Sequence, residues 1–309
     1  MLWISVIVLV IFSALIYALW YSYRIAFYSP NNKEQDVYAI PPGEQYEKIA
    51  DRMLLQIHEF QKLPFEQVYI NSYDGTKLAA RYYHNADNAP LIIQFHGYRG
   101  NAVREYSGGS KLAIRAGYNS LVVDQRAHGK SGGHTISFGI RERFDCKAWA
   151  EYAAKRFGNM PIILSGVSMG AATVLMASDL HLPANVRGII ADCPYSSPEA
   201  IIRKVCRDMK LPDKIIYPFI ALGAFVFGGF RMGESSALDS VKHSNLPILL
   251  IHGDDDRFVP CDMSTEIKNA CKGDIQLVTV PLAGHGISYL VDTERYENAF
   301  INFIDKQCK

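Results

Sequence analysis

The 309-residue sequence predicts an α/β protein with a mostly parallel central sheet flanked by helices. From Leu91 onward, short apolar runs typical of buried strands alternate with segments of helical spacing, which indicates parallel strands joined by right-handed crossovers. An apolar segment precedes this pattern, and a long insertion interrupts it at about 194–243. We therefore divide the chain into an anchor over 1–28, a linker and helix over 29–64, and a main domain over 65–309.

The first segment, Leu2 to Tyr23, contains no charged residue. A helix of roughly 20 apolar residues crosses a bilayer, and the aromatic residues at both ends of this run suit the two membrane interfaces. A cleaved signal peptide normally begins with basic residues and ends at small ones, and this run does neither. A buried core helix is a third interpretation, which the uniform apolarity disfavours. The pattern favours an uncleaved transmembrane helix that anchors the chain in the cell membrane.

Two observations bear on which side of the membrane the main domain faces. Arg24 and Lys33 follow the apolar segment, whereas only the terminal amine precedes it, and basic flanks tend to stay in the cytoplasm. The six cysteines show no paired spacing, which suits free thiols in a reducing compartment. Both observations favour a cytoplasmic main domain.

Residues 29–64 combine chain breakers with a helical pattern. Proline and glycine mark the first part as a linker, and the apolar spacing from Glu44 to Gln61 predicts a helix that packs on the domain or near the membrane. The next two segments, Phe65 to Ile70 and Lys77 to Tyr83, are predicted strands. Asp74-Gly75 between them is a hairpin signal.

The insertion over about 194–243 is predicted to be helical. Ser196 to Glu199 offers a capping serine followed by an early proline and glutamate, which together begin a helix. The stretch from Ile215 to Phe230 is almost entirely apolar, but at about 16 residues, with Pro218 inside it, it is short for a membrane span. Packing on the core and dipping into the bilayer are both consistent with this composition.

The strongest chemical signal is Gly166-Val167-Ser168-Met169-Gly170, which follows the apolar run 162–164 and leads into the helical run 171–177. A strand, then G-x-S-x-G, then a helix is the order of a nucleophile elbow, in which a sharp turn presents a serine hydroxyl. The glycines leave room where side chains would clash with the neighbouring strand and helix. An ordinary glycine-rich turn is the alternative interpretation.

A serine hydroxyl needs a base to take its proton and an acid to orient that base. In this architecture the partners follow in the order serine, acid, histidine. Three acids, Asp254, Asp255 and Asp256, follow the apolar run 248–251, and His285 follows the strand-like run 275–280. Each lies just past a predicted strand end, at the sheet edge where chemistry collects in open α/β sheets.

Over roughly residues 65–305 the chain resembles the α/β-hydrolase superfamily. The resemblance is nearest to the esterase and serine-aminopeptidase-like branch, particularly its bacterial membrane-anchored members. The motifs that carry it, in chain order, are His96-Gly97, Asp124-x-Arg126-x-His128-Gly129-x-Ser131, the elbow, His252-Gly253-x-x-Asp256-x-x-Val259-Pro260 and Gly284-His285.

The resemblance implies specific roles. The acid is Asp256, four residues after the histidine of its motif, with Asp254 and Asp255 as competitors. The backbone N–H groups of Tyr98 and Met169 form the oxyanion hole, and the Tyr98 ring lines the acyl pocket.

Two further expectations come from the same resemblance. Asp124 and Arg126 pair near a strand end in a structural loop that contains His128. The insertion over about 194–243 forms a cap whose apolar face roofs the substrate pocket.

These observations predict a serine hydrolase that cleaves carboxylic esters, including acyl or lipid-like ones, through an acyl-enzyme on Ser168, with His285 as the base. An aminopeptidase or amidase of the same fold is the alternative within enzymes, and a non-catalytic membrane-anchored binding module is the alternative outside them. We find no histidine pair at metal spacing, no phosphate loop and no dinucleotide fingerprint, so no metal or cofactor is expected. The net charge of +1 predicts no nucleic-acid partner.

Overall fold

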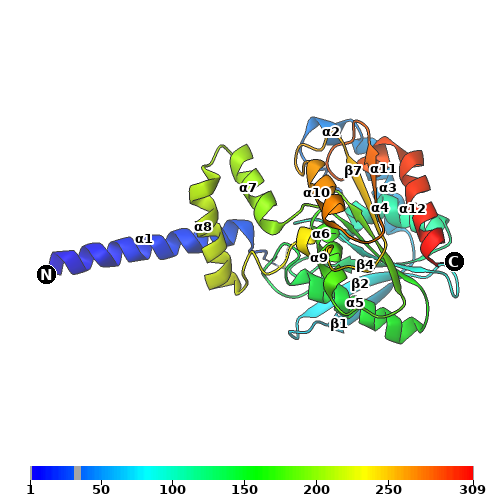
Figure 1. Cartoon of the computed structure of the whole chain (residues 1–309), viewed down its shortest axis with the longest axis horizontal. Helices are drawn as coiled ribbons and strands as arrows, with labels where there is room; N and C mark the ends of the chain where they lie inside the picture. Colours follow the sequence, from blue (N-terminus) through cyan, green and yellow to red (C-terminus); the bar gives the residue numbers. More distant parts are fainter. Residues whose placement is uncertain (1, 31–35, 309) are drawn as a thin grey trace.

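The computed structural model describes residues 2–30 and 36–308, with the backbone alone at 107–110, and its centre is one eight-stranded sheet (Figure 1). The strand order is β1-β2-β4-β3-β5-β6-β7-β8. β2 pairs antiparallel with β1 and β4, and the other neighbouring pairs are parallel. The predicted mostly parallel sheet is therefore confirmed. The strands are β1 (Glu66–Asn71), β2 (Lys77–Tyr83), β3 (Leu91–Phe95), β4 (Asn119–Asp124), β5 (Ile162–Val167), β6 (Val186–Asp192), β7 (Ile248–Gly253) and β8 (Ile275–Val280).

Helices cover both faces of this sheet. Successive side chains of a strand point to opposite faces, so Ile93 and Ile92 of β3 belong to two different apolar clusters. Because the central strands are buried on both faces, their sequences are apolar throughout rather than alternating. The helices are α5 (Glu142–Phe157), α6 (Met169–Met176) and α10 (Asp262–Ala270) on one face, and α4 (Ala102–Arg115) and α12 (Thr293–Cys308) on the other.

Residues 44–61 form two helices where the spacing predicts one. They are α2 (Glu44–Glu47) and α3 (Ala50–Gln61), separated at Ile49. Tertiary contacts account for the break. α3 buries Ile57 and Phe60 in a cluster with α4 and β2, whereas α2 directs Tyr46 toward the loop after β8.

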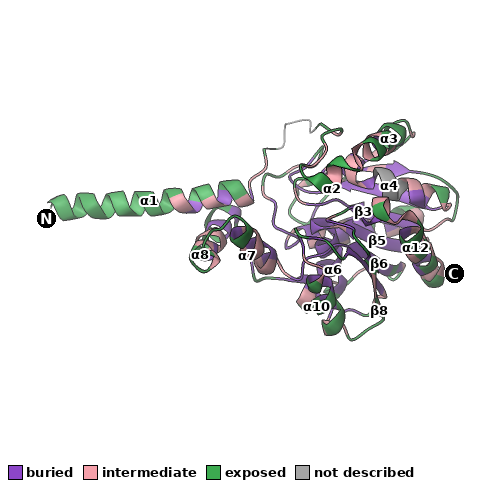
Figure 2. Ribbon diagram, turned by 90° about the horizontal axis from the view of Figure 1, so that it is seen from above, coloured by how far each residue is buried: buried purple, intermediate pink, exposed green. Residues whose placement is uncertain are grey.

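The N-terminal segment forms α1 (Leu2–Ala26), and its first part stands clear of the rest of the molecule (Figures 1 and 2). Its most apolar 18-residue window has a mean hydropathy of 2.7 and is 6% buried. Within residues 2–30 and 36–308, α1 is the one helix long and apolar enough to cross a membrane.

The other end of α1 packs into the main domain. Leu19 and Tyr23 are buried, and Phe27, just past the helix, is fully buried. The Phe27 ring meets the rings of Phe138 and Phe230 edge-on, with centroids 5.7 and 5.3 Å away. The last turns of the predicted anchor are thus part of an apolar cluster of the folded domain.

The insertion is helical, as predicted, and it lies beside α1 (Figure 1). Ser197 begins its first helix by accepting a hydrogen bond from the amide of Ala200 at 3.1 Å. Its second helix lies across α1, and Gly223 makes this close approach possible because a Cβ there would lie 2.6 Å from the carbonyl oxygen of Leu19. The elements are α7 (Pro198–Asp208), α8 (Asp213–Gly223), a π-helical turn (Ala224–Gly228) and α9 (Ala237–Ser240).

Candidate active site

Ser168 occupies a sharp turn between β5 and α6. Its backbone has a φ of 56° and a ψ of −115°, a region that residues with a side chain rarely adopt. The turn needs its glycines, because a Cβ on Gly170 would lie 1.7 Å from the carbonyl oxygen of Phe95. A Cβ on Gly166 would lie 2.2 Å from the backbone of Gly170. The local sequence therefore forces the serine side chain out of the strand line at the carboxyl edge of the sheet.

His285 connects Ser168 to Asp256. The His285 Nε2 atom lies 2.9 Å from Ser168 Oγ, and its Nδ1 atom lies 2.7 Å from Asp256 Oδ2. The other carboxylate oxygen of Asp256 accepts the amides of Phe258 and Val259 at 2.9 and 2.8 Å. The structure thus brings the three residues named from the sequence into one hydrogen-bonded chain.

Asp256 is set up to stay ionised. Burial alone would raise the pKa of its carboxyl group, but hydrogen bonds from His252 and His285 outweigh burial and hold that pKa well below its ordinary value. The two neighbouring acids face elsewhere. Asp255 pairs with Arg257, and Asp254 accepts the amide of Leu282 at 2.7 Å.

The loop after β3 lies against the serine. A Cβ on Gly97 would lie 3.3 Å from the Ser168 Cβ, so a larger residue would crowd the nucleophile. The Gly97 amide donates to the Glu105 carboxylate, which fixes the loop from inside the domain. Tyr98 follows Gly97 directly, and Met169 begins α6, where amides have no acceptor within the helix. Both residues predicted to supply oxyanion donors therefore flank the serine.

The Tyr98 side chain has a second contact. It lines the cavity described below, as its predicted place in the acyl pocket requires, and its ring packs on Phe138 at 4.9 Å between centroids. Its hydroxyl donates to the carbonyl of Ala26 at 2.8 Å, and the neighbouring Arg99 donates to the carbonyl of Ile25 at 2.7 Å. The loop is thereby fastened to the end of α1.

Three buried histidines brace loops around the site. His96 accepts the Gln125 amide at 3.1 Å, and His128 accepts the Arg99 amide at 3.1 Å. Burial lowers the pKa of His96 to about 4 and that of His128 to about 3, so both rings are neutral at pH 7. His252 joins the Val259 carbonyl and the Ser264 hydroxyl.

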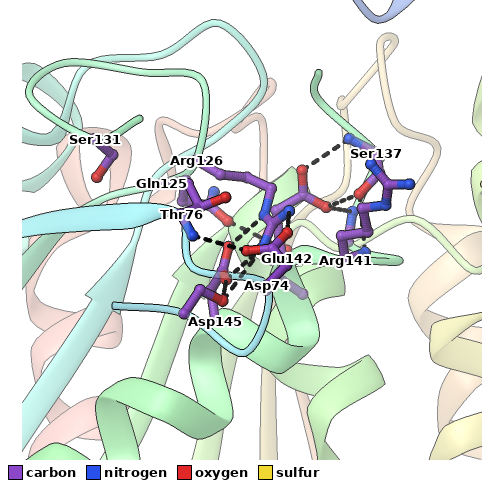
Figure 3. Close-up of polar contacts among 12 residues, drawn as sticks. Asp74, Thr76, Gln125, Arg126, Ser131, Ser137, Arg141, Glu142 and Asp145 are labelled. Carbon is purple, nitrogen blue, oxygen red and sulfur yellow. Dashed lines mark hydrogen bonds and ion pairs between the residues drawn. The ribbon is translucent and has the colours of Figure 1, made fainter. Parts of the chain in front are cut away.

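The predicted pairing of Asp124 with Arg126 is wrong. The Arg126 guanidinium binds Asp145 through two atoms at 2.5 and 2.6 Å and Asp74 at 3.0 Å (Figure 3). Asp124 instead accepts the amide of Lys130 at 3.0 Å. The resemblance implied the wrong partner, because in this chain Asp145 reaches the arginine from α5 and Asp74 reaches it from the turn between β1 and β2. The loop is still structural, and its arginine is buried.

A cavity of about 290 Å³ opens beside Ser168 and His285. The predicted roof is wrong, because among the described residues that line the cavity none comes from 194–243. Residues 41–56 cover it instead, through Pro41, Tyr46, Met53 and Gln56. The insertion does not reach the cavity, because its apolar residues pack on α1. Tyr46 also donates its hydroxyl to the carbonyl of His285 at 2.9 Å.

Three polar side chains line the cavity from the sheet. Gln94 of β3, Ser165 of β5 and Asp192 of β6 each interrupt an apolar strand and line the cavity from the sheet. We did not predict this group from the sequence. The signal that points to it is a polar residue near the end of each of three successive buried strands, whose carboxyl ends meet at one edge.

One cluster of metal-ligand side chains lies in the described part of the chain. Cys193, Asp256 and His285 place one ligand atom each within 4.8 Å of one another. The aspartate and histidine already share a hydrogen bond, and the histidine also reaches Ser168. This geometry suits proton transfer to and from a serine hydroxyl.

Comparisons with known proteins bear on the fold and the class of protein. The family model for serine aminopeptidase, S33, matches residues 86–219. The uncharacterized protein YqkD of Bacillus subtilis is 28% identical over 227 residues, which cover 72% of this chain and 74% of YqkD. Lysophosphatidylserine lipase ABHD12 of Rattus norvegicus is 24% identical over 197 residues, which cover 60% of this chain and 46% of the lipase.

Solved structures share the fold. The esterase Pf2001 of Pyrococcus furiosus superposes with a TM-score of 0.66 at 24% identity and covers 82% of this chain and 96% of its own. Est1E from Butyrivibrio proteoclasticus, in a structure with ferulic acid bound, gives a TM-score of 0.60 at 24% identity, with 78% of this chain and 98% of its own covered.

The sheet order, the strand–serine–helix turn and these matches define the α/β-hydrolase fold. This chain has the α/β-hydrolase fold, as its motifs predicted, residues 86–219 resemble the serine aminopeptidase family, and its relatives support a hydrolase.

Proposed function

We propose that the protein is a membrane-anchored serine hydrolase that cleaves carboxylic esters. The observation that carries the proposal is the hydrogen-bonded chain Asp256–His285–Ser168 at the edge of a cavity. A serine on an elbow, a base within hydrogen-bond reach of it and a buried acid on the far side of that base are the parts that acyl transfer needs.

Each residue has a role in this mechanism. Ser168 attacks the ester carbonyl while His285 takes its proton, and Asp256 holds the ring and stabilises its charged form. The amides of Tyr98 and Met169 donate to the oxyanion. His285 then gives the proton to the leaving alcohol, and a water activated by the same histidine hydrolyses the acyl-enzyme.

Esters are favoured over amides as substrates. One structural relative is named an esterase and one sequence relative is named a lysophosphatidylserine lipase. Apolar and polar side chains both line the cavity, which suits an acyl or lipid-like ester with a polar group. The serine aminopeptidase match keeps an aminopeptidase or amidase as the second candidate, and Asp192 is an acid that such an enzyme would use to hold a substrate amine.

The anchor is part of the proposal. α1 exposes an apolar surface over most of its length, and the chain enters the folded domain at its far end. With Arg24 on the domain side, the main domain lies in the cytoplasm. A green fluorescent protein fused after the C-terminal helix should then fluoresce in a bacterial host, whereas an alkaline phosphatase fused there should be inactive.

Labelling with a serine-reactive fluorophosphonate tests the central proposal. We expect the full-length protein in detergent to be labelled and to hydrolyse p-nitrophenyl butyrate. We expect Ser168→Ala to lose both, with a fall in turnover on the order of a million-fold. Retention of activity within tenfold by a folded Ser168→Ala variant would overturn the assignment. A folded wild type that takes no label would instead favour a non-catalytic binding module.

A further inference from the structure

One of the polar side chains that line the cavity from the sheet is a carboxylate with an oxygen that has no hydrogen-bond partner among the described residues. Asp192 is the last residue of β6 and is 4% exposed. The Tyr296 hydroxyl hydrogen-bonds to this carboxylate, whereas the Asp192 Oδ1 atom is buried and has no hydrogen-bond partner among the described residues. Leaving a buried carboxylate oxygen unpaired is costly, so its retention calls for a function.

Asp192 is also close to the nucleophile. Its backbone carbonyl accepts the amide of Ser168 at 2.8 Å, and its strand position lies beside Val167. Gln94 and Ser165 lie next to each other in the neighbouring strands and line the same cavity. Gln94 is held by the Ser120 hydroxyl at 2.6 Å. Gln94, Ser165 and Asp192 therefore line the same cavity as the reacting serine.

We propose that Asp192 forms a specificity subsite that accepts a hydrogen bond from a donor group of the substrate, a hydroxyl or an ammonium. This inference rests on the proposed ester hydrolysis. Apolar side chains, with Val167, Met53 and Phe300 among them, line the same cavity. The subsite therefore suits an ester whose chain carries a donor some distance from the carbonyl carbon.

The ionisation of Asp192 fits this use. Burial raises the pKa of its carboxyl group to about 6, so the group is mostly ionised at pH 7 and accepts hydrogen bonds strongly. A carboxylate that served only to stabilise the fold would have both oxygens paired, as the buried Asp145 does through Arg126 and Ser72.

The experiment compares p-nitrophenyl esters with three acyl chains of matched length: heptanoate, 6-hydroxyhexanoate and 6-aminohexanoate. A second series compares pentyl butyrate with the monobutyrate of 1,4-butanediol, and it covers the case in which the donor lies in the alcohol. For each series we measure the ratio of kcat/KM for the donor-bearing ester to kcat/KM for the apolar one. We expect this ratio to fall about tenfold in Asp192→Asn in at least one series, in line with roughly 1.4 kcal/mol for a charged hydrogen bond.

Asp274→Asn, an exposed acid paired with Lys306, is the matched control and should keep the wild-type ratio. The two acyl donors separate a hydroxyl subsite from an ammonium subsite. An unchanged ratio in both series would overturn the subsite. A protein that hydrolyses none of the five esters would contradict the proposed function itself.

The melting temperature gives an independent readout. Because the Asp192 carboxylate is buried and incompletely paired, we expect Asp192→Asn to melt at or above the wild-type temperature. A marked fall in melting temperature would show that the acid is structural and would count against the subsite.

A separate observation concerns the outer face of α8. Ile215, Phe219, Leu222 and Val226 recur at intervals of four, three and four residues, which places them on one side of the helix. Three of them are largely exposed, at 61%, 46% and 53% for Ile215, Leu222 and Val226. Phe225, at 49% exposure, adds to the same surface. We call these five residues the α8 face.

The α8 face continues the apolar surface of α1. Gly223 packs on Leu19 of α1, next to Trp20, and Phe227 lies 6.1 Å from the Tyr23 ring. A helix rises 1.5 Å per residue, so the stretch before Trp20 spans roughly 28 Å, close to the hydrocarbon thickness of a bilayer. α8 lies across α1 (Figure 1). The crossing at Leu19 is therefore where a spanning α1 would leave the hydrocarbon.

We propose that the α8 face is embedded in the interfacial layer of the membrane that α1 crosses. Lys210 and Lys214 are exposed beside it, where they meet anionic lipid head groups. The domain is thus held against the bilayer at two places, α1 and the α8 face. The loop after β3, which contains Tyr98, lies directly above the membrane surface.

Tryptophan quenching by brominated lipids tests this contact. In full-length protein with Trp3→Phe and Trp20→Phe, Phe225→Trp adds a reporter to the α8 face, and Phe65→Trp adds one at a similarly exposed ring just before β1, remote from α1. After reconstitution into phosphatidylcholine vesicles with bromines near the head groups, we expect strong quenching from position 225 and none above background from position 65. Equal quenching at the two positions would overturn the membrane contact.

Discussion

At the scale of single residues, the acid of the triad is chosen by loop geometry. Three aspartates stand in a row, yet only Asp256 has its carboxylate turned inward, because the amides of Phe258 and Val259 hold one of its oxygens. Asp254 and Asp255 satisfy other partners at the surface. The position of an acid in a loop therefore matters more than its presence there.

We predict that Asp256→Asn lowers kcat/KM on p-nitrophenyl butyrate by roughly 10⁴-fold, because an amide does not fix the His285 tautomer as a carboxylate does. Asp254→Asn and Asp255→Asn are matched controls and should stay within a fewfold of wild type. A loss in either control that equals the loss in Asp256→Asn would show that the acid was misassigned.

Buried histidines make the fold sensitive to acid. The folded-state pKa of His128, about 3, lies below its unfolded value near 6.5, so the unfolded chain takes up the proton more readily. The resulting stability is complete above pH 6.5 and is lost as pH falls toward 3, by up to about 1.4 kcal/mol per pH unit.

Unfolding in urea at several pH values checks this expectation. Between pH 6.5 and 4, the free energy of unfolding of His128→Asn should fall less steeply than that of wild type. The difference in slope should correspond to one proton, about 1.4 kcal/mol per pH unit. Parallel pH dependence of the two proteins would contradict the assignment of a neutral buried ring. His58→Asn, in an exposed position on α3, is the control.

At the scale of elements, short helices far from the motifs complete the site. α2 contributes Tyr46, whose hydroxyl donates a hydrogen bond to the carbonyl of His285, and α3 contributes part of the cavity wall.

We predict that Tyr46→Phe lowers kcat/KM three- to tenfold, because one hydrogen bond contributes about 1 kcal/mol to positioning His285. Tyr38→Phe removes an exposed hydroxyl on the same segment and should have little effect. Steady-state kinetics on one ester suffices, and equal values for the two variants would contradict a positioning role.

The end of α1 is an element of the core as well as of the anchor. We predict that Phe27→Ala costs about 3–5 kcal/mol, because a fully buried ring is lost from the cluster around Phe138 and Phe230. Phe12→Ala, which trims an exposed ring of α1, should leave the melting temperature in detergent unchanged. If both variants melt together at the wild-type temperature, the packing of residues 19–27 contributes no stability. A chain begun at residue 32 should likewise be less stable than one begun at residue 16.

At the scale of the whole molecule, the sheet and the hydrogen-bonded chain Asp256–His285–Ser168 could be predicted because their signals are local and ordered. Each catalytic residue follows its own strand, and parallel strands bring their carboxyl ends to one edge. The cover of the cavity could not be predicted, because it depends on contacts such as that of Tyr46 with the His285 carbonyl, far apart in sequence. The insertion was misplaced for a related reason. Its apolar composition predicts that it packs on another apolar surface, but it does not predict whether that surface belongs to the pocket or to α1.

Tyr98 and Arg99 donate hydrogen bonds to the last carbonyls of α1, so a movement of α1 is transmitted to the loop beside Ser168. A spanning helix tilts when the bilayer is thinner than its apolar length, and the end of α1 is bonded to the loop proposed to supply an oxyanion donor. We expect turnover in vesicles to change with the acyl length of the host lipid, with KM for a water-soluble ester nearly constant. Replacing the guanidinium by Arg99→Met should weaken that dependence, because one of the two ties is cut. Identical rates in thin and thick bilayers would mean that a tilt of α1 is not transmitted to the loop of Tyr98 and Arg99. The membrane would then position this protein without regulating its turnover.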